Sequence, residues 1–248
     1  MSASRGVLVV MAKPPRPGEV KTRMTPPLTP EQAAALYACL LDDVLASSAR
    51  IAAACALDPV LAVHPASACD ELARRCPAAF GVLGQRGADL GERMERAIED
   101  ALSTGAERVL LRGSDSPMLD MRHVLAALAA LETHDLAVCP DRDGGYSLVG
   151  VRAAVPGLFA HPMSTRRVLD DTLAAARRRG LRVSVEAPCF DLDRVADLRW
   201  LAEARGRGAE SLCPRTLAHL DARDLWRLVP DLGSEARAAP LAGGQQTR

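Results

Sequence analysis

The residues best suited to chemistry in this chain are cations gathered in one N-terminal loop. The 248 residues include two lysines, Lys13 and Lys21, both in the segment MAKPPRPGEVKTRM, whereas the other 29 of its 31 basic residues are arginines. A compact ammonium can contact a phosphate where a planar guanidinium does not fit. The alternative is a proline-rich connection in which chance left two lysines. We favour a phosphate site that includes Lys13, Gly18, Lys21 and Arg23.

Candidate metal ligands follow two later strand patterns. The motif GSDSP places Asp115 directly after the apolar segment Arg108–Gly113, and FDLD places Asp191 and Asp193 two residues apart. A carboxylate at the end of a strand can hold a hard cation such as Mg²⁺. The alternatives are a turn at Asp115 and a helix cap at Asp193.

Two glycine-bearing segments give weaker signals. In GQRGADLGERM, glycines flank the start of a helix, where backbone amides can take an anion or a base edge. In DRDGGYSLVG, two adjacent glycines permit a positive φ and a close approach to a ligand. Asp89 as an ordinary helix cap and an ordinary hairpin turn explain these segments equally well.

Composition argues against several other functions. Net charge is zero and aromatic residues make up 3% of the chain, which disfavours nucleic acid and anionic membranes as partners. No apolar stretch approaches the roughly 18 residues of a membrane span. Seven cysteines without a CxxC pair and five scattered histidines disfavour disulfides and zinc. We expect a cytoplasmic protein that binds neither nucleic acid nor membrane, and leave a homodimer open.

Strand and helix patterns alternate along the chain. Gly6–Ala12 is a continuous apolar run typical of a central buried strand, and Thr29 can cap a helix over Pro30–Ala54. Strands separated by helices predict a mostly parallel sheet in an α/β layered fold. Further strands are expected at Asp58–Val63, Arg108–Gly113, Asp135–Cys139, Tyr146–Val151 and Leu181–Val185, and helices at Ser67–Cys76, Ala88–Ser103, Leu119–Leu131, Ser164–Arg179 and Val195–Ala204.

This alternation also predicts the location of the site and the extent of the domain. Ligands of such sheets bind beyond the carboxyl ends of the strands. The N-terminal cations and the aspartates each follow a strand, so they should converge on one rim, as a metal–polyphosphate complex requires. We expect one domain over residues 1–204, a helical extension over 205–232 and a disordered tail over 233–248.

Six motifs in this order resemble a transferase family: AKPPRPGEVKTRM, GADLGERM, GSDSP, DGGYSLVG, MSTRRVL and DLDRVADL. The family comprises the rSAM/selenodomain-associated or arsenosugar-biosynthesis-type transferases, a branch of the nucleotide-diphospho-sugar transferase superfamily. The resemblance covers residues 6–200 and implies a GT-A-like three-layer α/β/α sandwich with a mostly parallel mixed sheet. Among characterised proteins, 2-phospho-lactate and molybdenum-cofactor guanylyltransferases are similar.

The resemblance also implies roles for particular residues. Asp115 and Asp193 match the metal aspartates of the superfamily, and Lys21 and Arg23 match a cluster that faces nucleotide phosphates. The chain departs from the family at Met163, at Ser114 and Ser116 around the first aspartate, and at Arg194-Val195, so its acceptor can differ. We assign Lys21, Arg23 and Asp115 to catalysis, Gln85, Asp89 and Gly91 to the nucleotide, and Asp143, Gly144, Gly145, Tyr146, Ser164 and Thr165 to the acceptor.

The motifs together predict a Mg²⁺-dependent nucleotidyltransferase. A phosphate on a small acceptor would attack a nucleoside triphosphate and release pyrophosphate, with the cations balancing the leaving charge. The first alternative is glycosyl transfer from a nucleotide sugar, which uses the same fold and metal. The second is a nucleotide-binding protein without catalysis.

Overall fold

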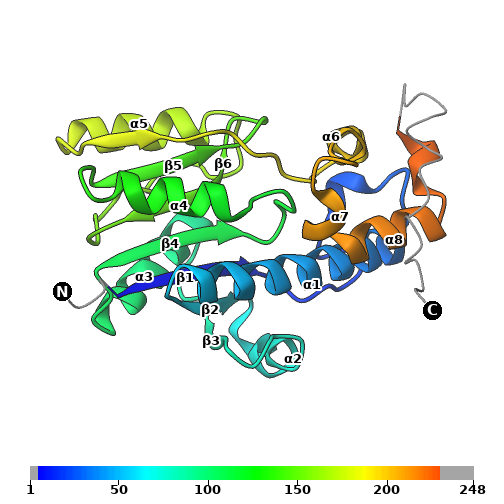
Figure 1. Ribbon diagram of the computed structural model, residues 1–248, viewed down its shortest axis with the longest axis horizontal. Helices are drawn as coiled ribbons and strands as arrows, with labels where there is room; N and C mark the ends of the chain where they lie inside the picture. The colour runs from blue at the N-terminus through cyan, green and yellow to red at the C-terminus, as the bar shows by residue number, and fades with distance from the viewer. Residues whose placement is uncertain (1–4, 230–248) are drawn as a thin grey trace, which may run out of the picture.

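The computed structural model describes residues 5–229, which fold around one seven-stranded sheet (Figure 1). The strand order is β3-β2-β1-β4-β6-β5-β7, and β1 (Gly6–Ala12) is central, with all seven of its residues buried. The flanking strands are β2 (Leu57–Val63), β3 (Gly81–Gly84), β4 (Arg108–Gly113), β5 (Leu136–Pro140), β6 (Tyr146–Val151) and β7 (Val183–Val185). The predicted α/β class is confirmed.

The sheet is parallel except at β6, which runs antiparallel to both of its neighbours, β4 and β5. Leu8 of β1 lies between Pro59 of β2 and Leu110 of β4. Because β6 runs in reverse, its first residue lies at the edge where the parallel strands end. The turn that joins β5 to β6 therefore shares that edge with the loops after β1 and β4.

Helices cover both faces of the sheet, because alternate residues of the buried strands point to opposite sides. On one face, Val7 and Val9 pack with α3 (Leu90–Ser103) and α5 (Val168–Arg178). On the other, Leu8 and Val10 pack with the long helix α1 (Pro30–Ala54) and with α4 (Met121–Ala130). Thr29 and Gln32 form a capping box at the start of α1, as the Thr-Pro pair predicts.

Shorter elements complete the chain. They are η1 (Thr22–Met24), η2 (Ala66–Ala68), α2 (Cys69–Ala73), η3 (Val195–Asp197), α6 (Leu198–Glu203), α7 (Ala209–Leu212), α8 (Pro214–Ala222) and η4 (Leu225–Leu228). Helix α8 packs on α1 and shares its hydrophobic cluster. The tail expected over 233–248 lies outside the described residues.

Two expectations about the elements are corrected. The strand β3 was not expected, because its four residues GVLG lack an apolar run and are at most partly buried. Helix α5 begins at Val168 rather than at Ser164, and its preceding residue Arg167 makes no side-chain cap. Residues 164–167 are therefore a loop that leads into α5.

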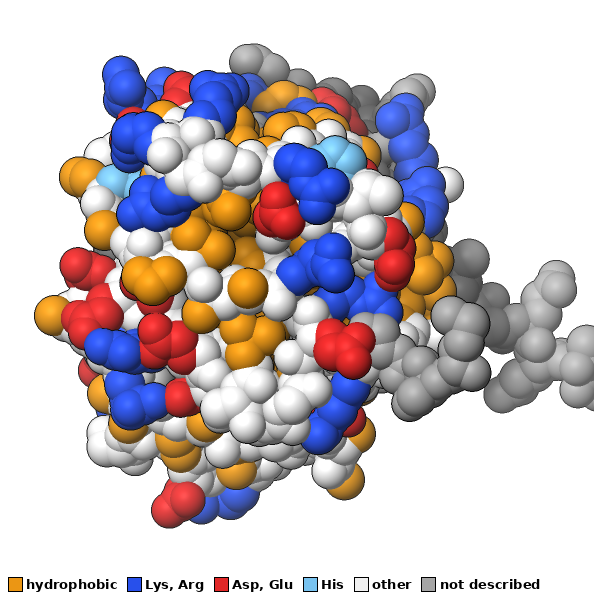
Figure 2. All heavy atoms as spheres, turned by 90° about the vertical axis from the view of Figure 1, so that its left-hand side faces the viewer, with side chains coloured by type: hydrophobic (Ala, Val, Ile, Leu, Met, Phe, Trp, Pro, Cys, Tyr) orange, Lys and Arg blue, Asp and Glu red, His pale blue; other side chains and the backbone are white. Residues whose placement is uncertain are grey.

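The two ends of the sheet differ in their surfaces. At the amino ends of the parallel strands, the described residues show acidic, basic and hydrophobic side chains intermixed (Figure 2). At the carboxyl ends the chain is hollowed into a cavity. Within residues 5–229, none of the helices has the length and apolar character needed to cross a membrane.

Candidate functional site

The carboxyl ends of β1 and β4 open into a cavity of about 700 Å³, a volume typical of small-molecule sites. Its wall combines the loops after β1 and β4, the start of α3, the β5–β6 turn, and the segments before α5 and η3. The predicted rim thus exists as a concave surface assembled from distant parts of the chain.

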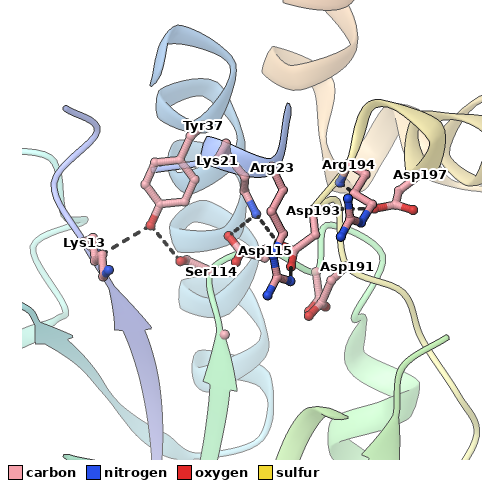
Figure 3. Close-up of polar contacts among 12 residues, drawn as sticks. Lys13, Lys21, Arg23, Tyr37, Ser114, Asp115, Asp191, Asp193, Arg194 and Asp197 are labelled. Carbon is pink, nitrogen blue, oxygen red and sulfur yellow. Dashed lines mark hydrogen bonds and ion pairs between the residues drawn. The ribbon is translucent and has the colours of Figure 1, made fainter. Parts of the chain in front are cut away.

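Lys21 lies at the centre of this site between two carboxylates (Figure 3). Its Nζ is 2.8 Å from Oδ1 of Asp115 and 3.0 Å from Oδ1 of Asp193. The lysine side chain is 4% exposed, and its backbone has a left-handed φ of 49°. Such backbone conformations are uncommon for residues other than glycine and gather at functional sites. The buried ammonium links the loop after β1 to both aspartate segments.

The electrostatics of this cluster favour the charged forms. Burial by itself would lower the pKa of Lys21, but Asp115 and Asp193 outweigh it and raise that pKa above its ordinary value. Burial would also raise the pKa of Asp193, but Lys21 and Arg23 hold it below its ordinary value. Arg23 Nη1 lies 3.1 Å from Asp193 Oδ2. At neutral pH the cluster therefore holds ionised Lys21 and Asp193.

A buried tyrosine holds the two loops in place. Tyr37 of α1 accepts a hydrogen bond from the backbone N–H of Lys13 at 3.3 Å, and its hydroxyl lies 2.8 Å from Ser114 Oγ (Figure 3). Burial, and then the charge of Asp115, raise the pKa of Tyr37 to about 12. The hydroxyl thus stays protonated and ties the end of β1 to the loop after β4.

Asp191 adds a third carboxylate to the wall of the cavity. Its Oδ1 accepts hydrogen bonds from Ser147 Oγ at 3.2 Å and from Ser116 Oγ. Burial, and then the negative charge of Asp115, raise the pKa of Asp191 to about 6. A bound cation would lower that pKa again.

The loop that carries Asp115 is anchored by Arg112, an arginine with 1% exposure. Its Nη2 donates to the carbonyl of Ser116 at 2.7 Å, and its Nη1 donates to Oγ of Ser48 on α1 at 3.2 Å. Burial lowers the pKa of Arg112 to about 10, so it remains charged. The buried guanidinium of Arg112 therefore anchors the loop after β4 to α1.

Neither predicted metal aspartate has a capping role. Asp120 caps α4, since its carboxylate accepts from the backbone N–H of Arg122. Before η3, the carboxylate of Asp197 accepts from the backbone N–H groups of Asp193 and Arg194. The carboxylates of Asp115 and Asp193 therefore face the cavity and pair with Lys21, and that of Asp193 pairs also with Arg23.

The β5–β6 turn forms a second, acidic wall. Oδ1 of Asp141 accepts from the backbone N–H of Asp143 at 3.1 Å and of Gly145 at 2.8 Å. Burial, and then Asp143 and Asp191, raise the pKa of Asp141. Gly144 has a φ of 96°, and a Cβ there would lie 2.1 Å from the carbonyl oxygen of Arg166. Glycine thus lets the turn pack against the loop before α5.

Most of the predicted binding residues line the cavity. They are Lys13, Lys21, Arg23, Gln85, Asp115, Asp143, Gly145, Tyr146, Ser164, Thr165 and Asp193. Four do not, which corrects their expected placement. A Cβ at Gly18, which has a φ of 76°, would meet nothing within 4 Å, whereas Gly144 packs against the backbone of Arg166. Asp89 caps α3 by accepting from Glu92 N–H at 2.9 Å, and a Cβ on Gly91 would lie 2.2 Å from the carbonyl oxygen of Phe159.

Five charged residues of the cavity wall were not assigned from the sequence: Glu19, Arg93, Asp141, Arg166 and Arg194. Asp191, which also lines the cavity, was named with Asp193 as a candidate metal ligand, because the alternation of an extended segment points both side chains to one side. Asp141 follows β5 as Asp115 follows β4. The arginines gave no signal, because each is one among 29 in an arginine-rich chain.

The sequence is similar to a protein family and to two guanylyltransferases. The family model DUF2064, described as an uncharacterized protein conserved in bacteria, matches residues 46–165. The chain is 32% identical over 199 residues to phosphoenolpyruvate guanylyltransferase of Sphaerobacter thermophilus. That alignment covers 77% of this chain and 90% of that protein. It is 34% identical over 215 residues to 3-phospho-D-glycerate guanylyltransferase of Phenylobacterium zucineum, covering 84% and 93%.

A solved structure shares the whole architecture. It comes from Desulfovibrio desulfuricans G20 and is provisionally assigned as a nucleotide-diphospho-sugar transferase. The two structures superpose with a TM-score of 0.81 at 31% sequence identity, over 90% of this chain and 97% of the other. The similarity therefore spans nearly the whole length of both chains.

Proposed function

Because this chain belongs to the DUF2064 family and has guanylyltransferases among its homologues, we propose that it is a metal-dependent guanylyltransferase. It would transfer a guanylyl group from GTP to the phosphate of a small phosphorylated acid and release pyrophosphate. The observation that carries this proposal is the contact of Lys21 with Asp115 and Asp193 at the cavity. Cations and carboxylates at one point suit a metal-bound polyphosphate.

The carboxylates fit a magnesium ion. Asp115, Asp191 and Asp193 present hard oxygen donors to one cavity, and the described partner of Asp115 Oδ1 is the ammonium of Lys21 at 2.8 Å. Over residues 5–229, no three acidic, histidine or cysteine side chains form a ready metal cage. Mg²⁺ commonly binds one or two carboxylates and completes its shell with phosphates and water. Asp115 and Asp193, assisted by Asp191, would hold it.

The side chains of this chain would act mainly by positioning and charge neutralisation. The bound metal would supply a positive charge at the α-phosphate. Lys21, which is preorganised by its two carboxylates, and the more exposed Arg23 would balance the charge that grows on the leaving pyrophosphate. An acceptor phosphate is already ionised at neutral pH, so an attacking oxygen needs no general base.

Product analysis tests the proposal. The protein is incubated with Mg²⁺, with each nucleoside triphosphate, and with phosphoenolpyruvate or 3-phosphoglycerate, and the products are followed by pyrophosphate release and mass spectrometry. We expect pyrophosphate and a guanylylated acid from GTP, and loss of both with Asp115→Asn. No pyrophosphate from any triphosphate and acceptor pair would count against nucleotidyl transfer.

Glycosyl transfer remains a second candidate, supported by the resemblance to the nucleotide-diphospho-sugar transferase structure. It requires neutralisation of a nucleoside diphosphate leaving group, which the same cations could provide. Release of a nucleoside diphosphate from a nucleotide sugar, without pyrophosphate from GTP, would select this candidate instead.

A further inference from the structure

Arg93 is a cation in the wall of the cavity that has no partner among the described residues. It lines the cavity from the first turn of α3. Within residues 5–229 its side chain makes no hydrogen bond or ion pair, and its buried Nε has no partner. The guanidinium therefore has no partner among the described residues, and its place in the cavity wall leaves it available to a bound ligand.

The backbone around Arg93 is rigid. Asp89 caps the helix, and Gly91 lets α3 approach the carbonyl oxygen of Phe159 so closely that a Cβ would lie 2.2 Å from it. Oε1 of Glu95 accepts from the backbone N–H of Phe159 at 3.1 Å. At Gly87, with a φ of 139°, a Cβ would lie 2.8 Å from the backbone nitrogen of Arg93. The guanidinium therefore projects from a preorganised base.

The surroundings of Arg93 suit a flat, partly apolar group. Leu90 and Met94 lie on α3 beside Arg93 and also line the cavity, as does Met11 of β1. Leu90 is 37% exposed, whereas most large apolar side chains of the described residues are buried. Gln85 Nε2 donates to the carbonyl of Ala62 at 2.8 Å. This fixes the amide, and its Oε1 accepts no hydrogen bond from the described residues.

The cations that we assign to the phosphates, Lys21 and Arg23, contact Asp193. Apolar side chains beside a few fixed polar groups, as in the wall near Arg93, are typical of a seat for an organic ring. A guanidinium matches two adjacent acceptors, which the O6 and N7 atoms of guanine provide. Adenine offers N7 beside an N6 donor, and cytosine offers an N4 donor, so neither matches the fork as well.

We infer that Arg93 recognises the O6/N7 edge of guanine, with Leu90 and Met94 against the face of the ring. Arg93 thereby selects GTP among the nucleoside triphosphates. This inference rests on the proposed guanylyl transfer and adds the residue that chooses the base.

A comparison of base analogues tests this role. Affinities for GTP, 7-deaza-GTP, ATP and inorganic tripolyphosphate are measured with Mg²⁺ for the wild-type protein, Arg93→Ala, Arg93→Lys and Arg96→Ala. Arg96 is the matched control, because it lies three residues further along α3 and pairs with Glu99 at 2.8 Å, outside the cavity wall. Circular dichroism verifies that each variant is folded.

We expect the wild type to bind GTP about 10-fold more tightly than 7-deaza-GTP, the lower part of the range for a bidentate guanine contact. In Arg93→Ala, the affinity for GTP should fall to that for 7-deaza-GTP, while the affinity for tripolyphosphate stays unchanged. Arg93→Lys keeps a charged donor that can still reach O6 and N7 but lacks the planar fork, so it should retain only part of the discrimination. Arg96→Ala should behave as the wild type.

Two results would overturn the role of Arg93. One is an equal loss of affinity for GTP, 7-deaza-GTP and tripolyphosphate in Arg93→Ala, which would show that Arg93 contacts phosphate. The other is a wild type that binds GTP and 7-deaza-GTP alike or prefers ATP. Either result leaves pyrophosphate release intact, so failure of this inference is distinguishable from failure of nucleotidyl transfer.

Discussion

At the scale of single residues, Lys21 is the feature with the largest electrostatic consequence. Its ammonium lies within 3.0 Å of oxygens from Asp115 and Asp193, the two carboxylates proposed to hold the metal. A lysine in this position keeps two acidic groups close together when no metal is bound. Its left-handed backbone shows that the loop after β1 bends to bring it there.

Replacing Lys21 with methionine should destabilise the protein without Mg²⁺. The two carboxylates would face each other without a counter-charge, at a cost of about 1 to 3 kcal/mol. This is below the loss for fully buried pairs, because the carboxylate side chains are 34% and 31% exposed. Urea unfolding with and without Mg²⁺ measures the effect, and Mg²⁺ alone should stabilise the variant more than the wild type.

Arg23→Met is the matched control for that change. Arg23 also pairs with Asp193, but its side chain is 47% exposed, so its loss should cost less than about 1 kcal/mol. Equal unfolding free energies for the Lys21 variant and the wild type would contradict the central role of the ammonium.

At the scale of elements, the site depends on how α1 holds two loops of the sheet edge. The hydroxyl of Tyr37 contacts the backbone of Lys13 and the side chain of Ser114, while Ser48, further along the same helix, supports Arg112. One helix thus sets the separation between the phosphate loop and the loop that carries Asp115.

Tyr37→Phe should loosen this connection while leaving the fold intact. Loss of a buried hydroxyl that makes two hydrogen bonds should cost about 1 to 2 kcal/mol. We expect KM for the Mg²⁺–nucleotide to rise several-fold, because the two loops lose their common anchor, with a smaller change in kcat. Steady-state kinetics and chemical denaturation provide the measurement, and unchanged values of both would show that the hydroxyl does not position the loops.

At the scale of the whole molecule, the C-terminal helices are continuous with the core that supports the site. Asp43 of α1 is 1% exposed, and its carboxylate accepts from the backbone N–H groups of Arg215 and Thr216 and from Thr216 Oγ1. Trp226 is buried in the same hydrophobic cluster as Tyr37. We propose that residues 205–229 stabilise α1 and, through α1, the site.

Asp43→Ala should therefore destabilise the entire fold by about 2 to 4 kcal/mol, because several buried donors lose a charged acceptor. Unfolding is followed by tryptophan fluorescence and by far-ultraviolet circular dichroism. Both probes should report the same single transition, with its midpoint lowered in the variant. A fluorescence transition that precedes the loss of helix signal would instead show that the C-terminal helices unfold as a separate unit.

The sequence by itself determined most of the fold. Continuous apolar runs marked β1 and β4, the Thr-Pro pair marked the start of α1, and alternation with helices predicted the layered sheet. It failed at β3, whose four residues are neither fully buried nor strongly apolar. It also failed at the start of α5, where residues 164–167 pack on the β5–β6 turn instead of extending the helix. Contacts with distant segments override local preference at both places.

For the site, the sequence alone identified Lys21, Asp115 and Asp193 as candidates, because unusual residue types follow strands that end at one rim. Their contact, and the inclusion of Asp141, Asp191 and Arg93 in the same cavity wall, were decided by the tertiary structure. The reversed direction of β6 brings the acidic turn to that rim, and close packing of Gly91 on Phe159 sets the position of α3. Local sequence patterns indicate which residues follow a strand. The antiparallel direction of β6 and the packing of α3 determine which of those residues lie in the same cavity.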